Sequence, residues 1–141
     1  MQPQLMGAPP TEERQVVWEV LAQIWVDTWY DAAQLDEFAD RLARCGFSLR
    51  ELDRIAHREV CGAFAIFTLT VFASAGMALP DWCFPKDHAR KVVAAWLSRP
   101  RLLSFLNPFW VAGYFAARGF LRPTWLDLRT RVAQRLNVPV A

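Results

Sequence analysis

Apolar residues recur every three or four positions along most of this 141-residue chain, and no segment alternates apolar and polar residues in steps of two. The first spacing is typical of a helix with one buried side, and the second of a half-buried strand. Asp31 and Ser48 each precede a Gln or Glu by three positions, which is the capping-box arrangement at the start of a helix. The pattern predicts an all-α fold, a single compact bundle of six or seven helices.

The stretch Val60–Pro80 contains no charged residue, and we expect the other helices to pack around it as a central apolar helix. About 20 apolar residues would also be long enough to span a bilayer. However, Gly, Ala, Ser and Thr make up much of the stretch, and Arg is frequent on both sides of it, whereas membrane proteins concentrate Lys and Arg on one side. We therefore favour a core helix. The alternative is an inner-membrane or membrane-surface protein that inserts Val60–Pro80 and Leu102–Ala117.

Prolines and capping residues divide the second half of the chain into further helices. Leu102–Leu106 is expected to form one short turn. Asn107 and Pro108 are expected to begin a helix that ends at Gly119, because Asn is a common N-cap and Pro fits the first helical turn. Thr124 is expected to cap a separate last helix.

The length of 141 residues suits one domain, and an apolar fraction of 54% excludes a disordered chain. Residues 1–10 carry neither charge nor a long apolar run and end in two prolines, so we expect a flexible tail there. Residues 11–141 are expected to form a single helical domain.

Charge is distributed unevenly, although the formal net charge is only +2. Residues 1–40 carry eight acidic residues and one Arg, a net charge of −7, and residues 86–141 carry ten basic and two acidic residues, a net charge of +8. We expect the acidic first helices to pack beside the basic last ones. The alternative is a basic face that binds an acidic partner. On the last helix the candidate partner contacts are Trp125, Arg129, Arg131 and Arg135.

Two Cys and two His form the one constellation with metal-ligand chemistry. His57 and Cys61 are four positions apart and would share a helix face, and Cys83 and His88 follow at a spacing of five. Two thiolates and two imidazoles suit tetrahedral zinc. Neither pair has the close C-x2-C spacing of a zinc knuckle, so we expect free thiols and no cofactor.

Part of the chain resembles a small bacterial domain family of unknown function. The first helix of that family has a Trp followed seven positions later by an aromatic residue and then x-Asp-Thr, which Trp18, Trp25, Asp27 and Thr28 match. The segment 46–55, with Glu59-Val60 after it, is similar to the third helix of the family. The resemblance covers residues 14–60 and implies no catalytic residue.

The sequence lacks the motifs by which several functional classes of protein are recognised. The sequence has no Gly-rich phosphate loop, no G-x-S-x-G elbow and no helix-turn-helix or aromatic-basic motif, so we expect neither an enzyme nor nucleic-acid binding. An odd number of Cys favours a reducing compartment, and the first ten residues lack the apolar run of a signal peptide. We expect a non-enzymatic cytoplasmic protein-binding protein of immunity or adaptor type, which acts by association with a partner protein. The oligomeric state is left open.

Overall fold

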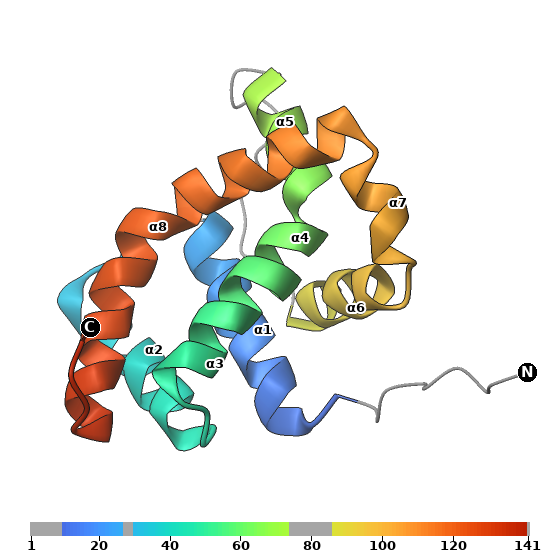
Figure 1. Ribbon diagram of the computed structural model, residues 1–141. Helices are drawn as coiled ribbons and strands as arrows, with labels where there is room; N and C mark the ends of the chain where they lie inside the picture. The colour runs from blue at the N-terminus through green and yellow to red at the C-terminus, as the bar shows by residue number, and fades with distance from the viewer. Residues whose placement is uncertain (1–9, 27–29, 74–85, 141) are drawn as a thin grey trace, which may run out of the picture.

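The computed structural model describes residues 10–26, 30–73 and 86–140, and every regular element within these ranges is helical. The predicted all-α bundle is therefore confirmed (Figure 1). Most of the predicted tail, residues 1–9, lies outside the described ranges. In chain order the elements are α1 (Glu12–Val26), α2 (Ala32–Arg44), α3 (Leu49–Arg54), the π-helix η1 (Ile55–Val60), α4 (Cys61–Ala63), α5 (Ala65–Ala73), α6 (Lys86–Leu97), α7 (Arg101–Phe105) and α8 (Pro108–Leu136).

Both predicted capping boxes are present. The carboxylate of Asp31 accepts a hydrogen bond from the backbone N–H of Gln34 at 2.8 Å, and the Gln34 side chain accepts one from the backbone N–H of Asp31 at 3.0 Å. Ser48 and Glu51 make the same reciprocal pair at the start of α3. Gly46 separates the two helices with φ of +76°, a conformation that costs Gly little. These local signals fix where α2 and α3 begin.

The elements α3, η1, α4 and α5 follow one another almost without a break, and between α4 and α5 the backbone of Phe64 (φ −97°, ψ 7°) departs from helical angles (Figure 1). This run contains the described part of the uncharged stretch, because residues 74–80 lie outside the described ranges. Cys61, Phe64 and Ala65 are buried as expected. Ile66 is 46% exposed and Phe67 is 36% exposed, so the expectation that the whole stretch is hidden is wrong for these residues. Helix α5 packs mainly against α8, and the ring of Phe67 also meets that of Trp25 from α1.

Helix α1 is the most enclosed helix of the described bundle. Every residue from Val17 to Ala22 is buried, and so are Ile24 and Trp25. Its neighbours are α2, η1, α6 and α8, which contact it from different sides. The sequence predicts burial on more than one side, because Val17, Leu21 and Ile24 form one apolar stripe and Trp18, Leu21 and Trp25 form an adjoining one. One stripe alone would leave a solvated face.

Two carboxylates lie in the interior beside α1, and each has Arg partners. Glu19 is 3% exposed, and its carboxylate pairs with Arg41 from α2 and Arg90 from α6. Glu59 from η1 is buried, pairs with Arg14 and accepts a hydrogen bond from the indole N–H of Trp18 at 2.6 Å. A buried carboxylate is costly unless it is paired, so these contacts fix α2, α6 and η1 against α1.

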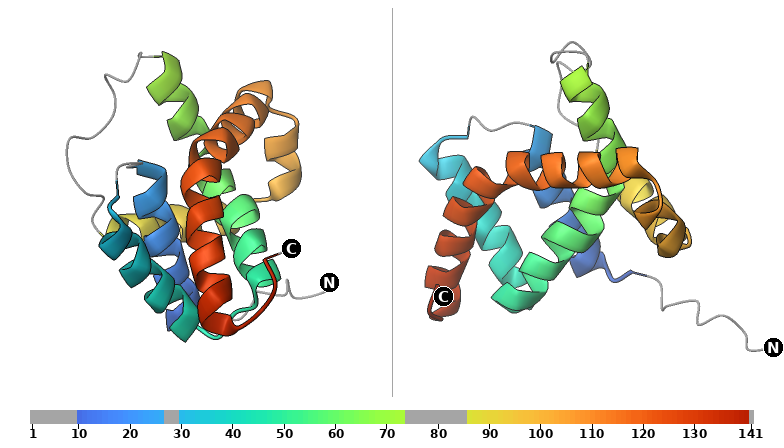
Figure 2. Two further views of the ribbon diagram at one scale, coloured as in Figure 1. Left: turned by 90° about the vertical axis from the view of Figure 1, so that its left-hand side faces the viewer. Right: turned by 45° about the horizontal axis from the view of Figure 1, so that its top comes forward.

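Helix α8 differs from its prediction. The sequence indicates a helix that ends at Gly119 and another that Thr124 caps, but the structure has one helix from Pro108 to Leu136 with Pro123 inside it. Figure 2 shows this helix bending between its orange and red halves. A proline removes one backbone hydrogen bond and clashes with the preceding turn, so it bends a helix that packing holds on both sides.

Helix α8 crosses α5 at Gly113. A Cβ at this position would fall within the van der Waals radius of the backbone carbonyl oxygen of Ala65. The two helices therefore approach as closely as they do because this residue has no side chain.

We expect Gly113→Ala to lower the free energy of unfolding by about 2–3 kcal/mol, because the added methyl group collides with backbone that cannot move aside. Chemical denaturation followed by circular dichroism measures the change. The matched control is Gly119→Ala in the same helix, where no atom lies within 4 Å of the added Cβ. It should be neutral or stabilise by up to about 1 kcal/mol, since Ala favours helix. Equal effects of the two substitutions would contradict the close crossing.

We expect Arg90→Gln to lower the free energy of unfolding by about 2–3 kcal/mol, because the buried Glu19 then keeps only Arg41 as a cationic partner. The neighbouring exposed Lys91 supplies the control, and Lys91→Gln should change stability by no more than about 0.5 kcal/mol. A small effect of both would mean that Glu19 does not depend on Arg90.

Candidate functional site

Five large apolar side chains are exposed within eight residues on α7 and at the start of α8. We call them the α7 surface, which consists of Leu102, Leu103, Phe105, Leu106 and Phe109. Leu102 is 80% exposed and Leu106 is 79% exposed. Figure 1 shows α7 at the edge of the molecule, beside α6 and the start of α8. Single exposed apolar residues are ordinary, but a contiguous group of this kind marks a contact surface.

Local sequence explains why these side chains do not bury themselves. Pro100 precedes α7, and Asn107 and Pro108 restart the chain as α8. A helix of five residues is too short to turn a whole apolar face inward. The sequence pattern predicts this segment only as a short turn or as part of an inserted segment. The signal for an exposed apolar surface was its four apolar residues between two prolines, with Phe109 directly after the second proline.

Aromatic rings form a firm base beside the α7 surface. The ring of Phe105 meets Trp110 edge-on with centroids 5.3 Å apart, and Trp110 stacks between Trp96 at 5.2 Å and Tyr114 at 5.3 Å. We call Trp96, Trp110 and Tyr114 the ring stack. The indole N–H of Trp110 donates a hydrogen bond to the carbonyl oxygen of Gly62 at 3.1 Å, which anchors the stack to α4.

Gly62 allows the stack to lie this close to α4. A Cβ at this position would lie 2.7 Å from the indole nitrogen of Trp96, which is closer than real contacts allow. The uncharged stretch therefore contributes a flat backbone surface on which Trp96 and Trp110 rest.

Two arginines lie at the ring stack. The guanidinium of Arg118 lies 5.8 Å from the centroid of the Tyr114 ring, a cation–π contact. The backbone carbonyl of Arg58 accepts a weak hydrogen bond from the indole N–H of Trp96 at 3.4 Å. Burial raises the pKa of Tyr114, and the charges of Arg118 and Arg58 partly offset the rise. Both arginines are exposed, and neither forms an ion pair with a described carboxylate.

The predicted partner contacts on the last helix bind other helices of the chain instead. Trp125 is 2% exposed and donates a hydrogen bond to Asp53 at 2.9 Å, and Arg129 pairs with the same carboxylate at 3.0 Å. Arg131 and Arg135 pair with carboxylates of α2. The expected packing of the acidic first helices beside the basic last one is thus confirmed. A partner-binding role for these three arginines would require their ion pairs to open.

The candidate zinc ligands do not form a metal site among the described residues. Cys61 is buried, and this burial raises the pKa of its thiol to about 12. His57 lies one turn before it, and burial lowers the pKa of that imidazole. His88 is exposed on α6, and Cys83 lies outside the described residues. Among the described residues, no group of three or more His, Cys, Asp or Glu is placed to hold a metal ion.

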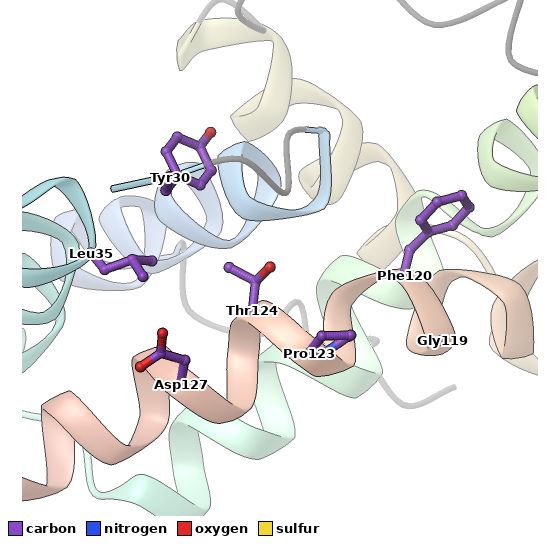
Figure 3. A pocket seen from close by; sticks show the side chains of 7 residues that line it. All are labelled: Tyr30, Leu35, Gly119, Phe120, Pro123, Thr124 and Asp127. Atoms are coloured by element: carbon purple, nitrogen blue, oxygen red, sulfur yellow. The ribbon is translucent and has the colours of Figure 1, made fainter. Parts of the chain in front are cut away.

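An open cavity of about 480 Å³ lies beside the bend of α8 (Figure 3). Two of its polar side chains already have partners. The hydroxyl of Tyr30 donates a hydrogen bond to the carbonyl of Gln23 at 2.8 Å, and the carboxylate of Asp127 pairs with Arg131 at 3.0 Å. The cavity is lined by Tyr30, Leu35, Gly119, Phe120, Pro123, Thr124 and Asp127.

The membrane-spanning alternative receives no support from the helices. Within the described ranges, none of them combines the length and the apolar character that crossing a bilayer requires.

Comparison with protein families identifies the chain as a member of one whose function is not assigned. The family described as Domain of unknown function (DUF7079) matches residues 12–131, so the chain belongs to it. The resemblance to a family of unknown function is confirmed at that level, and the match extends well beyond residues 14–60. No curated protein and no solved structure matches the chain.

The ion pairs of Asp36 give a pH dependence that can be tested. Hydrogen bonds from Arg131 and Arg135 hold the pKa of the Asp36 carboxyl below its usual value. A lowered pKa in the folded state contributes stability above the unfolded pKa, and this stability is lost as the pH falls through the folded pKa.

We therefore expect the free energy of unfolding to fall below about pH 4, and Asp36→Asn to make that fall smaller. Denaturation midpoints between pH 7 and pH 3 measure the profile. Glu37→Gln, at an exposed position of the same helix, is the control and should leave the profile unchanged. An identical fall in the wild type and in Asp36→Asn would contradict the assignment.

Proposed function

We propose that the chain is a non-enzymatic protein-binding protein of immunity or adaptor type, which associates with a partner protein through the α7 surface. The observation that carries the proposal is the exposure of five Leu and Phe side chains within eight residues. Burial of exposed apolar area is the dominant favourable term in most protein association. Hot spots of binding also form around large anchors at a well-packed site.

The ring stack supports this choice of surface. Trp110 is buried, is hydrogen-bonded to α4 and contacts Phe105, so the surface rests on a fixed base. A partner that docks there would immobilise few additional groups, and this lowers the entropic cost of association.

The groups that commonly carry catalysis have structural roles here. Glu19 and Glu59 are held in ion pairs, and the thiol of Cys61 has a pKa of about 12, which disfavours the nucleophilic thiolate. These observations support the non-enzymatic part of the proposal. A cytoplasmic location and a bacterial origin, as in the resembling family, are also part of it.

A membrane-surface protein is the second candidate, and one observation favours it. The sequence has no Asp or Glu from residue 88 to residue 126, the segment that contains the α7 surface, while Lys91 and Arg99 there are exposed. Exposed Leu and Phe beside cations can bind the headgroup region of an anionic bilayer.

We expect Leu102→Ser combined with Leu106→Ser to abolish capture of the partner from a lysate of the host. Both side chains project into solvent, so the denaturation midpoint should not change. Leu126→Ser combined with Val138→Ser removes two exposed apolar side chains from the other half of α8 and its end, and is the matched control. Quantitative comparison of the captured proteins by mass spectrometry provides the result. Capture of the same proteins by wild type and by the α7 variant would refute the proposal.

A further inference from the structure

We infer that the partner presents an acidic amphipathic helix to this chain, with apolar side chains on the α7 surface and Asp or Glu side chains at Arg118 and Arg58. This inference rests on the proposed function, which it makes more specific. Helix-in-groove recognition combines an apolar stripe with flanking charges in this way.

The arginines of α8 support this inference, because they differ in their partners before and after the bend. After the bend, Arg129, Arg131 and Arg135 all pair with carboxylates of α2 or α3. Before the bend, Arg118 and Arg122 are exposed and pair with no described carboxylate. The same helix thus satisfies its cations within the bundle at one end and leaves them available at the other. An acidic partner would supply the missing counter-charges.

The sequence also supports the inference, because the segments that form most of this surface contain no acidic residue. Segments 60–80 and 88–126 contain no Asp or Glu, and they supply α4, α5, α7 and the first part of α8.

The contacts between the aromatic rings and Arg118 also support the inference. Contacts lead without interruption from Phe105 to Trp110, Tyr114 and the guanidinium of Arg118. An exposed apolar side chain, Phe105, and an exposed cation, Arg118, therefore lie at the two ends of one chain of contacts. An amphipathic helix likewise carries an apolar stripe with charges beside it. The contact with Tyr114 orients the planar guanidinium, whose paired N–H groups match a carboxylate.

Other occupants fit this surface less well. A second copy of the chain in a two-fold dimer would place the same positive charges against each other. Four acids of a second copy are also already paired, since Glu12, Glu19, Asp36 and Asp40 have Arg partners. An anionic bilayer attracts Lys and Arg as general charges and does not require a guanidinium oriented on an aromatic ring.

The test starts from a library of random 16-residue peptides displayed on phage. Peptides are selected on the wild-type protein after depletion on the Leu102→Ser, Leu106→Ser variant. We expect enriched peptides to carry Leu or Phe at helical spacing together with an excess of Asp and Glu. A synthetic copy of the most enriched peptide is then titrated by fluorescence anisotropy at low salt.

We expect Arg58→Gln combined with Arg118→Gln to weaken binding of that peptide about tenfold, and added salt to reduce the difference. The control is Arg44→Gln combined with Arg50→Gln, which removes two exposed charges beside the loop between α2 and α3, far from α7 (Figure 1). Its affinity should match that of the wild type.

The two possible failures can be told apart. Enrichment of apolar peptides without acidic residues, bound equally by wild type and by the Arg58→Gln, Arg118→Gln variant, overturns this inference and leaves the proposed function standing. No enrichment over the depleted variant overturns both. In that case, the wild type and the Leu102→Ser, Leu106→Ser variant are sedimented with phosphatidylglycerol vesicles. Sedimentation of the wild type but not of the variant would assign the surface to a membrane.

Discussion

The buried carboxylate of Glu19 is the constraint on which the arrangement of the bundle depends. It lies on α1, the most enclosed of the described helices, where an unpaired charge would be far too costly. Arg41 from α2 and Arg90 from α6 neutralise it from two sides, so both helices must lie beside α1. Glu59 does the same for η1 through Arg14. Apolar burial supplies most of the stability, and these ion pairs specify which helices become neighbours.

The bend of α8 divides the protein into two electrostatic environments. Beyond Pro123 the helix runs along α2, where acidic side chains neutralise its arginines. Before Pro123 it crosses α5 at Gly113, next to the uncharged stretch and to α7, and residues 60–80 and 88–126 contain no Asp or Glu. Exposed apolar side chains and unneutralised cations therefore occur together at one end of the molecule. This coincidence is what makes that end suited to binding.

A binding surface whose side chains are already ordered in the folded protein lowers the entropic cost of association, because folding has ordered those side chains beforehand. The ring stack is held by the hydrogen bond from Trp110 to Gly62 and by the contact of Arg118 with Tyr114. In the proposed function, the partner would contact groups whose positions the fold has already set. In the cavity at the bend, by contrast, the hydroxyl of Tyr30 and the carboxylate of Asp127 are already bonded within the chain.

Local and compositional properties could be predicted from the sequence. The capping boxes at Asp31 and Ser48, the burial of α1 on more than one side and the pairing of acidic and basic helices depend on neighbours in sequence or on overall charge. The continuity of α8 through Pro123, the exposure of Ile66 and the exposure of the α7 surface could not be predicted. An apolar residue in a sequence indicates only that burial would be favourable, and whether another helix covers it is decided by how the whole chain packs. Tertiary structure alone therefore decided that Leu102 and Leu106 face solvent while Trp125 does not, because α2 and α3 pack against one half of α8 and no described element covers Leu102 and Leu106.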